Sequence, residues 1–256
     1  MCSSDLRRPA RGAAADRVSI VLRSGRGRAR LDRERSDLVA TVAHELRSPL
    51  TGVKGFVQVM LNRWDRLSDE QKKLMLTTVS VDSDRLTRLI AELLDVARID
   101  TGRLQLHRRP VDPAVIAGRV VESASAAATR PIELDLSPAP HVDADPDKLT
   151  QVLTNLVENA LRHGEGTVRV SLGAAAAPEG EEAGVLIEVC DEGEGIPVSL
   201  RRTVFTKFWK NGARGGSGLG LYVVHGLTRA HGGTVTIDDA PGGGARIGVW
   251  WPASSD

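Results

Sequence analysis

The sequence is poor in aromatic residues, which make up only 3% of its 256 residues. Because 41% of the residues are hydrophobic all the same, the cores of the protein must consist mainly of aliphatic side chains. Cysteine occurs only at Cys2 and Cys190, which excludes a framework of disulfide bonds. The length allows one large domain or two modest ones.

The sequence also lacks an excess of one charge and a long apolar run. Lysine and arginine number 34 against 33 acidic residues, giving a net charge of +1. This balance gives no electrostatic reason to expect binding to nucleic acid or to an anionic membrane. No stretch is apolar for long enough to cross a bilayer, and no secretory leader opens the chain. We expect a soluble, cytoplasmic protein with no membrane contact of its own, and any upstream sensor domain would lie outside this sequence.

The first third of the chain predicts two long helices. Residues 1–17 indicate a tail, and 18–22 could form a short strand. Apolar periodicity then predicts a helix over about 28–62, kinked at Pro49. At 100° per residue, His44 lies about 160° from the apolar stripe of this helix, beside Glu45. This position argues against a buried histidine, although a surface histidine without a role would fit the same pattern.

Ser68 and Gln71 form a capping-box pair, which predicts that a second helix begins there and continues to about Gly102. Two long helices with a short connection form an antiparallel hairpin. A hairpin by itself buries one face of each helix. Pairing two copies into a four-helix bundle would cover both apolar stripes, so we predict a homodimer.

The remainder of the chain mixes strands and helices, which predicts an α/β two-layer sandwich. Asp112 and Asp145 each precede a proline, a signature of helix N-termini. We therefore predict three parts: a tail or linker at 1–27, a helical hairpin at 28–102 and a sandwich domain at 103–256. The expected strands are 104–107, 132–136, 142–144, 167–172, 185–190, 234–237 and 245–250, and the expected helices are 112–127, 145–163 and 218–230.

Asn155 and Asn159 lie four residues apart and therefore share one face of the helix predicted at 145–163. Asparagine is a mediocre helix former, so two at this spacing call for a reason. One interpretation is a polar rim at the helix edge. The other is that their amide oxygens ligate Mg²⁺ or contact phosphates, with Arg162 and His163 adding charge and a ring at the helix end.

Two segments are rich in glycine: one follows a predicted strand and the other leads into a predicted helix. Asp191 begins a segment with Gly193, Gly195 and Ile196, in which the aspartate could accept a hydrogen bond from a ligand amine; a simple acidic turn is the alternative. The segment 216–220 leads into a helix and could offer backbone amides to phosphates. It is not a P-loop, because no Gly-Lys-Ser/Thr follows.

The order of these segments resembles that of the sensor histidine kinases of two-component signalling. The run from His44 through Glu45 to Leu50 resembles the phosphoacceptor box of that family. The asparagine pair, the 191–195 segment, Phe205 with Phe208, and the 216–220 segment resemble its ATP-site boxes. The resemblance covers about residues 30–251.

The resemblance implies an α+β protein: a dimerisation and histidine-phosphotransfer hairpin, then a Bergerat-type ATP-binding sandwich. It implies that Asp191 binds the adenine amino group, Asn159 ligates Mg²⁺, Asn155 and Arg162 face the phosphates, and His163 lies near the base. Residues 198–217 would form a lid. The full set implied to bind ATP is Asn155, Asn159, Arg162, His163, Asp191, Gly193, Gly195, Ile196, Phe205, Phe208, Gly216, Ser217, Gly218, Leu219 and Gly220.

The resemblance also implies a histidine autokinase. His44, assisted by Glu45, would take the γ-phosphoryl group of ATP and pass it to an aspartate on the receiver domain of a response regulator. Hydrolytic relatives of the ATP fold have a glutamate where this chain has Asn155, which favours transfer over hydrolysis. The alternatives are a nucleotide-binding dimeric scaffold that transfers nothing, and an ATPase driven by lid closure. Ser48 and Gly164 depart from the residues the family often has there.

Overall fold

The computed structural model describes residues 25–177, 180, 182–210 and 216–254, with side chains from residue 39 onward. The predicted tail and the predicted strand at 18–22 lie outside the described residues. The chain divides into two compact units after Ser83, and each unit is described by itself. The element order, two long helices followed by a mixed α/β sandwich, confirms the predicted α+β fold class.

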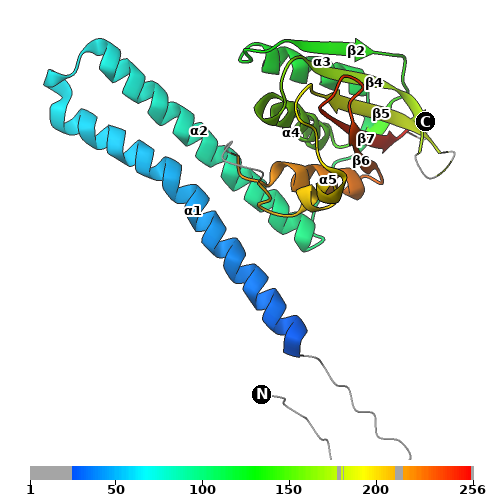
Figure 1. The fold of residues 1–256 in the computed structure, drawn as a ribbon, viewed down its shortest axis with the longest axis horizontal. Helices are drawn as coiled ribbons and strands as arrows, with labels where there is room; N and C mark the ends of the chain where they lie inside the picture. The colour runs from blue at the N-terminus through cyan, green and yellow to red at the C-terminus, as the bar shows by residue number, and fades with distance from the viewer. Residues whose placement is uncertain (1–24, 178–179, 181, 211–215, 255–256) are drawn as a thin grey trace, which may run out of the picture. The chain divides into compact units, whose positions relative to one another are not determined.

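The first unit ends at Ser83 and contains one long helix and the first half of a second, which form a helical hairpin (Figure 1). Helix α1 spans Gly25–Arg63 and continues through Pro49, a 3₁₀ turn occupies Trp64–Arg66, and α2 spans Asp69–Asp100. The predicted capping box is present: the backbone N–H of Ser68 donates to Gln71 Oε1 at 3.0 Å, and that of Gln71 donates to Ser68 Oγ at 3.3 Å. Within the described residues, no helix is long and apolar enough to span a bilayer.

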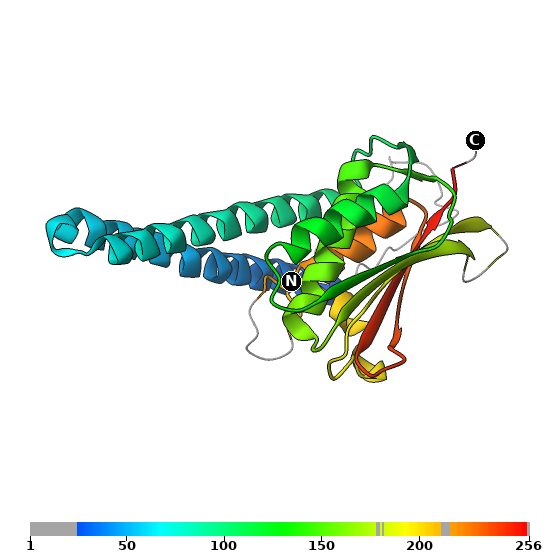
Figure 2. The same ribbon diagram turned by 90° about the horizontal axis from the view of Figure 1, so that it is seen from above.

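The second unit is a two-layer sandwich in which three helices cover one face of a sheet (Figure 2). Its helices are α3 (Pro113–Ser125), α4 (Pro146–His163) and α5 (Gly220–Ala230). Two short 3₁₀ turns, η2 (Val198–Leu200) and η3 (Thr203–Phe205), follow β5 and precede α5 in the chain. The strands are β1 (Arg109–Val111), β2 (Ile132–Leu136), β3 (Val142–Ala144), β4 (Val168–Ala176), β5 (Ala183–Cys190), β6 (Thr234–Asp239) and β7 (Ala245–Pro252).

The main sheet has the strand order β2-β4-β5-β7-β6, in which only the β2–β4 pair is parallel. A separate two-stranded sheet joins β1 to β3 in antiparallel register, with Arg109 opposite Ala144. The predicted strand at 104–107 was wrong. The backbone N–H of His107 donates to Asp145 Oδ2 at 2.9 Å, so a side chain satisfies it and strand pairing begins only at Arg109.

The sandwich core lies between the sheet and the helices. Helix α4 buries one face, which is made of Leu149, Val152, Leu153, Leu156, Val157 and Ala160. Its predicted N-cap is present, because Asp145 Oδ1 accepts the backbone N–H groups of Asp147 and Lys148. The fully buried His231 accepts the backbone N–H of Asp145 through Nε2 at 3.1 Å, and its ring lies 4.9 Å from that of Trp251.

The C-terminal half of α2 belongs to the second unit and is held there by a buried carboxylate. Asp95 is 4% exposed. Its Oδ1 accepts from Lys148 Nζ at 2.8 Å and its Oδ2 accepts from Gln151 Nε2 at 2.8 Å. Both partners lie on the first turns of α4. A buried carboxylate with both oxygens satisfied fixes the end of α2 against α4.

We predict that Asp95→Asn lowers the free energy of unfolding by about 2–4 kcal/mol, because the half-buried Lys148 loses its counter-charge. Urea unfolding followed by tryptophan fluorescence measures the loss. Asp69→Asn is the matched control, because the side chain of Asp69 is 94% exposed and forms a surface ion pair with Lys72. It should change the free energy by less than about 1 kcal/mol. Equal effects of the two substitutions would contradict the structural role of Asp95.

Candidate functional site

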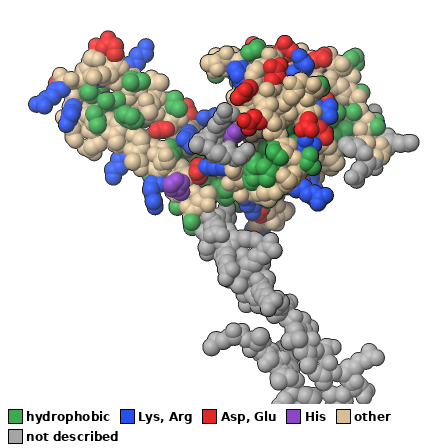
Figure 3. Space-filling view, in the orientation of Figure 1, with side chains coloured by type: hydrophobic (Ala, Val, Ile, Leu, Met, Phe, Trp, Pro, Cys, Tyr) green, Lys and Arg blue, Asp and Glu red, His purple; other side chains and the backbone are tan. Residues whose placement is uncertain are grey.

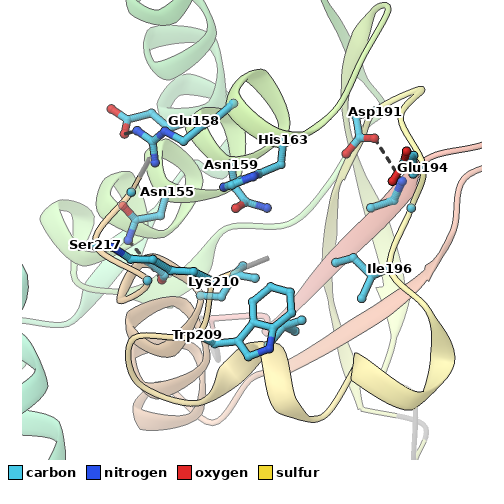
Figure 4. A pocket seen from close by; sticks show the side chains of 18 of the residues that line it. Asn155, Glu158, Asn159, His163, Asp191, Glu194, Ile196, Trp209, Lys210 and Ser217 are labelled. Carbon is cyan, nitrogen blue, oxygen red and sulfur yellow. Dashed lines mark hydrogen bonds and ion pairs between the residues drawn. The ribbon is translucent and has the colours of Figure 1, made fainter. Parts of the chain in front are cut away.

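The polar face of α4 forms one wall of a cavity of about 380 Å³ in the second unit (Figure 4). Since α4 buries its apolar face in the core, residues at i, i+4 and i+7 on the other side are directed together. Asn155, Asn159 and Arg162 follow this spacing and all line the cavity. The side chain of Asn159 makes no hydrogen bond to any residue that the structure describes, so its amide oxygen is available to a ligand.

One end of the cavity is built from the glycine-rich segment that leads into α5. Asn155 Nδ2 donates to the carbonyl oxygen of Gly220 at 3.4 Å, which ties α4 to this segment. Gly218 has a φ of +71°, and a Cβ there would lie 2.7 Å from the carbonyl carbon of Phe208. The turn therefore requires glycine. With backbone N–H groups at the start of a helix, this end suits an anion.

A carboxylate from α2 reaches the same end of the cavity. Ser217 Oγ donates to Glu92 Oε2 at 2.5 Å and accepts the backbone N–H of Leu219 at 3.2 Å. Burial raises the pKa of Glu92 above its ordinary value, and the hydrogen bond from Ser217 offsets only part of that rise. Glu92, which lies on α2, is thus a protein carboxylate that lines this end of the cavity.

Asp191 lies at the opposite end of the cavity, where β5 ends, on the far side from Asn155 and Ser217 in Figure 4. Its Oδ1 accepts the backbone N–H groups of Gly193 at 2.9 Å and Ala245 at 3.2 Å. Its Oδ2 accepts nothing from the described part of the chain, and so can accept a hydrogen bond from a ligand amine. The apolar lining is formed by Ile196, Val204, Trp209, Leu221 and Ala245.

The backbone packs very closely around Asp191. A Cβ on Gly164 would lie 2.3 Å from Asp191 Cβ, and a Cβ on Gly244, whose φ is +90°, would lie 2.0 Å from the carbonyl oxygen of Asp191. Neither position has space for a side chain, and the close backbone packing restrains Asp191. The departure noted at Gly164 thus accompanies a close approach that a side chain would block.

The charges of the cavity are mixed. Cations come from Arg162 and Lys210. The acidic lining residues are Glu92, Glu158, Glu165, Asp191 and Glu194. Within the described residues, no group of three or more His, Cys, Asp and Glu side chains could hold a metal by itself. A magnesium ion here would take few protein ligands and would depend on phosphate oxygens for the rest, as Mg²⁺ commonly does.

Most of the residues predicted from the sequence meet at this cavity. Those that line it are Asn155, Asn159, Arg162, His163, Asp191, Gly195, Ile196, Gly216, Ser217, Gly218 and Gly220. Gly193 and Leu219 do not line it but support it, Gly193 by donating to Asp191 and Leu219 as a fully buried core residue. The two phenylalanines also lie outside the lining: Phe205 packs on His225 with ring centroids 5.2 Å apart, and Phe208 has a φ of +59°.

Sequence reasoning missed several lining residues, among them Trp209 and Lys210. They follow Phe208 directly, and an aromatic next to a cation in a glycine-rich region was a signal that could have been used. The predicted lid at 198–217 is described only to residue 210 and from 216. His44 and Glu45 lie on α1 in the first unit, where His44 is exposed and Glu45 is half-buried.

Two protein-family models match the chain. The His Kinase A (phospho-acceptor) domain matches residues 34–102, and the histidine kinase-, DNA gyrase B-, and HSP90-like ATPase matches residues 144–255. The chain belongs to the sensor histidine kinases. The first match contains His44 and the second contains all of α4, Asp191 and the glycine-rich segment. The ATPase match therefore supports ATP binding by this part of the chain.

Curated relatives carry the same assignment. The chain is 36% identical over 214 residues to the probable sensor histidine kinase TcrY of Mycobacterium tuberculosis, covering 80% of this chain and 43% of that protein. It is 34% identical over 225 residues to the sensor histidine kinase ZraS of Escherichia coli O157:H7, covering 85% of this chain and 46% of that protein. The chain therefore spans less than half the length of these relatives.

Solved structures show a similar fold. A full-length ShkA in complex with AMPPNP superposes with a TM-score of 0.62 at 30% identity, covering 86% of this chain and 47% of that chain. The histidine kinase AdeS of Acinetobacter baumannii gives a TM-score of 0.62 at 24% identity, covering 83% and 98% of the two chains, and supports the fold alone.

We predict that Gly164→Ala weakens ADP binding by at least about tenfold, because the added Cβ must displace Asp191 or the end of α4. Isothermal titration calorimetry measures the affinity. The matched control is Gly118→Ala inside α3, where a Cβ meets no atom within 4 Å. It should leave ADP affinity unchanged and stabilise the helix by up to about 1 kcal/mol. Wild-type affinity in Gly164→Ala would show that Asp191 does not need this close packing.

Proposed function

We propose that this kinase chain transfers the γ-phosphoryl group of ATP to His44 and then to an aspartate on the receiver domain of a response regulator. The observation that carries the proposal is the cavity on α4. It combines an anion-accepting glycine-rich end next to Asn155, an amine-accepting Asp191 at the other end, and Asn159 on the same face of α4 as Asn155. Such a site orients a nucleoside triphosphate and exposes its terminal phosphate.

His44 has the properties of an acceptor. Its side chain is exposed on α1, and no hydrogen bond or ion pair joins it to a described residue. One nitrogen of the neutral ring would attack the γ-phosphorus in line, so that an N–P bond forms while the bond to the oxygen of ADP breaks. Glu45 would stabilise the positive charge on the ring and accept the proton of the other nitrogen.

The cavity favours transfer to a side chain over hydrolysis. Asn155 is an amide and cannot take a proton from water. The neighbouring carboxylate of Glu158 is engaged by Arg88 at 3.3 Å and by Arg162 at 3.6 Å. A carboxylate engaged by two guanidinium groups is not free to orient an attacking water.

Asn159 would provide the protein ligand of Mg²⁺. Its amide oxygen has no competing partner among the described residues, and hard oxygen ligands suit this ion. The remaining ligands would be phosphate oxygens and water. Bound there, the ion would neutralise charge that develops on the transferred phosphoryl group.

A second copy of the chain would cover the hairpin. The described part of the first unit exposes several large apolar side chains, which gather over the hairpin in Figure 3. Leu61 is 74% exposed and Leu74 is 68% exposed. Apolar exposure on two adjacent helices is typical of an oligomer interface. A parallel pairing of two hairpins into a four-helix bundle would bury it, and the receiver domain would contact the hairpin near His44.

We predict that γ-labelled ATP with Mg²⁺ labels the protein, and that His44→Gln abolishes the label. The label should be stable to base and lost in acid, as expected of a phosphorus–nitrogen bond. His141→Gln is the control, because His141 is an exposed histidine that does not line the cavity. It should retain full labelling. Steady release of inorganic phosphate without any labelled protein would contradict the proposal and indicate an ATPase.

We predict that Asn159→Ala lowers the affinity for ADP by about tenfold with Mg²⁺ present and has little effect in EDTA, because the substitution removes only the metal ligand. Calorimetric titrations under the two conditions measure the difference. Asn62→Ala, an exposed asparagine near the end of α1, should change neither value. An equal loss with and without the metal would assign Asn159 to the nucleotide itself.

A further inference from the structure

A second cavity, of about 720 Å³, lies between α3 and α4. Its α4 lining includes Thr150, Thr154, Val157 and Leu161. The first cavity, which we call the nucleotide cavity, is lined from α4 by Asn155, Asn159 and Arg162. At 100° per residue these two sets lie roughly 140° apart around the helix. Glu158 is the one α4 residue that lines both. We refer to the second cavity as the α3–α4 groove.

The walls of the α3–α4 groove are largely apolar. Ile116 and Val120 of α3 are buried and face Val157 and Leu161 of α4 across it. Ala124 adds a small side chain from α3, which leaves room in the groove. Cavities of several hundred Å³ with apolar walls and a few polar groups are typical of sites for small molecules.

Three arginines line the same groove, and one of them has a buried nitrogen without a partner. Arg130 Nη2 donates to the carbonyl oxygen of Ala160 at 2.6 Å, but its Nη1 is buried and donates to no described residue. The side chains of Arg109 and Arg119 also make no hydrogen bond or ion pair within the part of the chain that the structure describes. A buried guanidinium N–H without an acceptor is costly, and an anion would satisfy it.

Two acidic residues line the groove, but they do not cancel this charge. Glu158 already forms ion pairs with Arg88 and Arg162. Arg88 lies on α2 and Arg162 lines the nucleotide cavity, so neither belongs to the groove. Asp147 is exposed in the first turn of α4. Its negative charge there is favourable for the helix N-terminus. A positive excess around Arg130 therefore remains available to a ligand.

We propose that the α3–α4 groove binds a small amphiphilic anion: a molecule with one negatively charged head group on Arg130 and an apolar body between α3 and α4. The guanidinium geometry suits a carboxylate, phosphate or sulfonate group, which can accept two parallel N–H donors. The apolar walls select against a free inorganic anion. The groove shares only Glu158 with the nucleotide cavity and requires no phosphoryl transfer.

Fluorescence titration of the full chain tests this site with two probes of the same shape. 8-Anilino-1-naphthalenesulfonate carries the anion, and N-phenyl-1-naphthylamine has the same rings without it. Saturating ADP is present to occupy the nucleotide cavity. We expect the sulfonate to bind at least about tenfold more tightly than the neutral probe. Arg130→Met should remove most of that preference while leaving the neutral probe within about twofold.

A second variant tests the location independently of the charge. Ala124→Trp fills the groove from α3 and should weaken both probes by about tenfold or more. Arg169→Met is the control, because Arg169 pairs with Glu133 on the sheet and does not line the groove. It should change neither affinity. Thermal melting checks that each variant is folded. If Arg130→Met does not fold, the proposal is tested by Ala124→Trp and by the preference of the wild type for the sulfonate. Unchanged sulfonate binding in Ala124→Trp, or equal binding of the two probes by the wild type, would overturn the proposal.

Discussion

The carboxylate of Asp145 fixes where α4 begins, and the nucleotide cavity depends on that position. It accepts three backbone N–H groups, from His107, Asp147 and Lys148. Burial alone would raise the pKa of Asp145, but these donors outweigh it and the pKa is lowered. The cap holds the first turn of α4 in place, and the buried face of the same helix then directs Asn155 and Asn159 to the cavity. The cap is therefore a condition for the site as well as for the helix.

The opposite end of the cavity is fixed by close backbone packing rather than by a cap. Asp191 is held between Gly164 at the end of α4 and Gly244 before β7, and neither position has space for a Cβ. Its Oδ1 is occupied by Gly193 and Ala245, which leaves Oδ2 to face a ligand. A carboxylate with one oxygen restrained has little freedom to rotate. The site can therefore discriminate a ligand amine by position, because the acceptor does not have to be ordered on binding.

The features that were predictable from the sequence are those determined within a few residues. The capping pair at Ser68 and Gln71 and the N-caps at Asp112 and Asp145 are local, and all three are present. The shared face of Asn155 and Asn159 follows from helix geometry alone. The strand expected at 104–107 failed because β1 is set by its pairing with β3, more than thirty residues away in the chain. The lining residues Trp209 and Lys210 were missed because they follow short 3₁₀ turns, which have no periodicity to read.

The contribution of α2 to the cavity could not be inferred from either half of the sequence separately. Glu92 lies in the hairpin helix, yet it accepts a hydrogen bond from Ser217 in the glycine-rich segment that leads into α5. Its pKa is already raised by burial. A phosphate group placed on the backbone amides beside Ser217 would add negative charge next to this carboxylate and would raise its pKa further. By linkage, the ionised carboxylate must then weaken phosphate binding to the same extent that the phosphate disfavours its ionisation. Protonation of Glu92 would therefore be coupled through charge to anion binding at this end of the cavity.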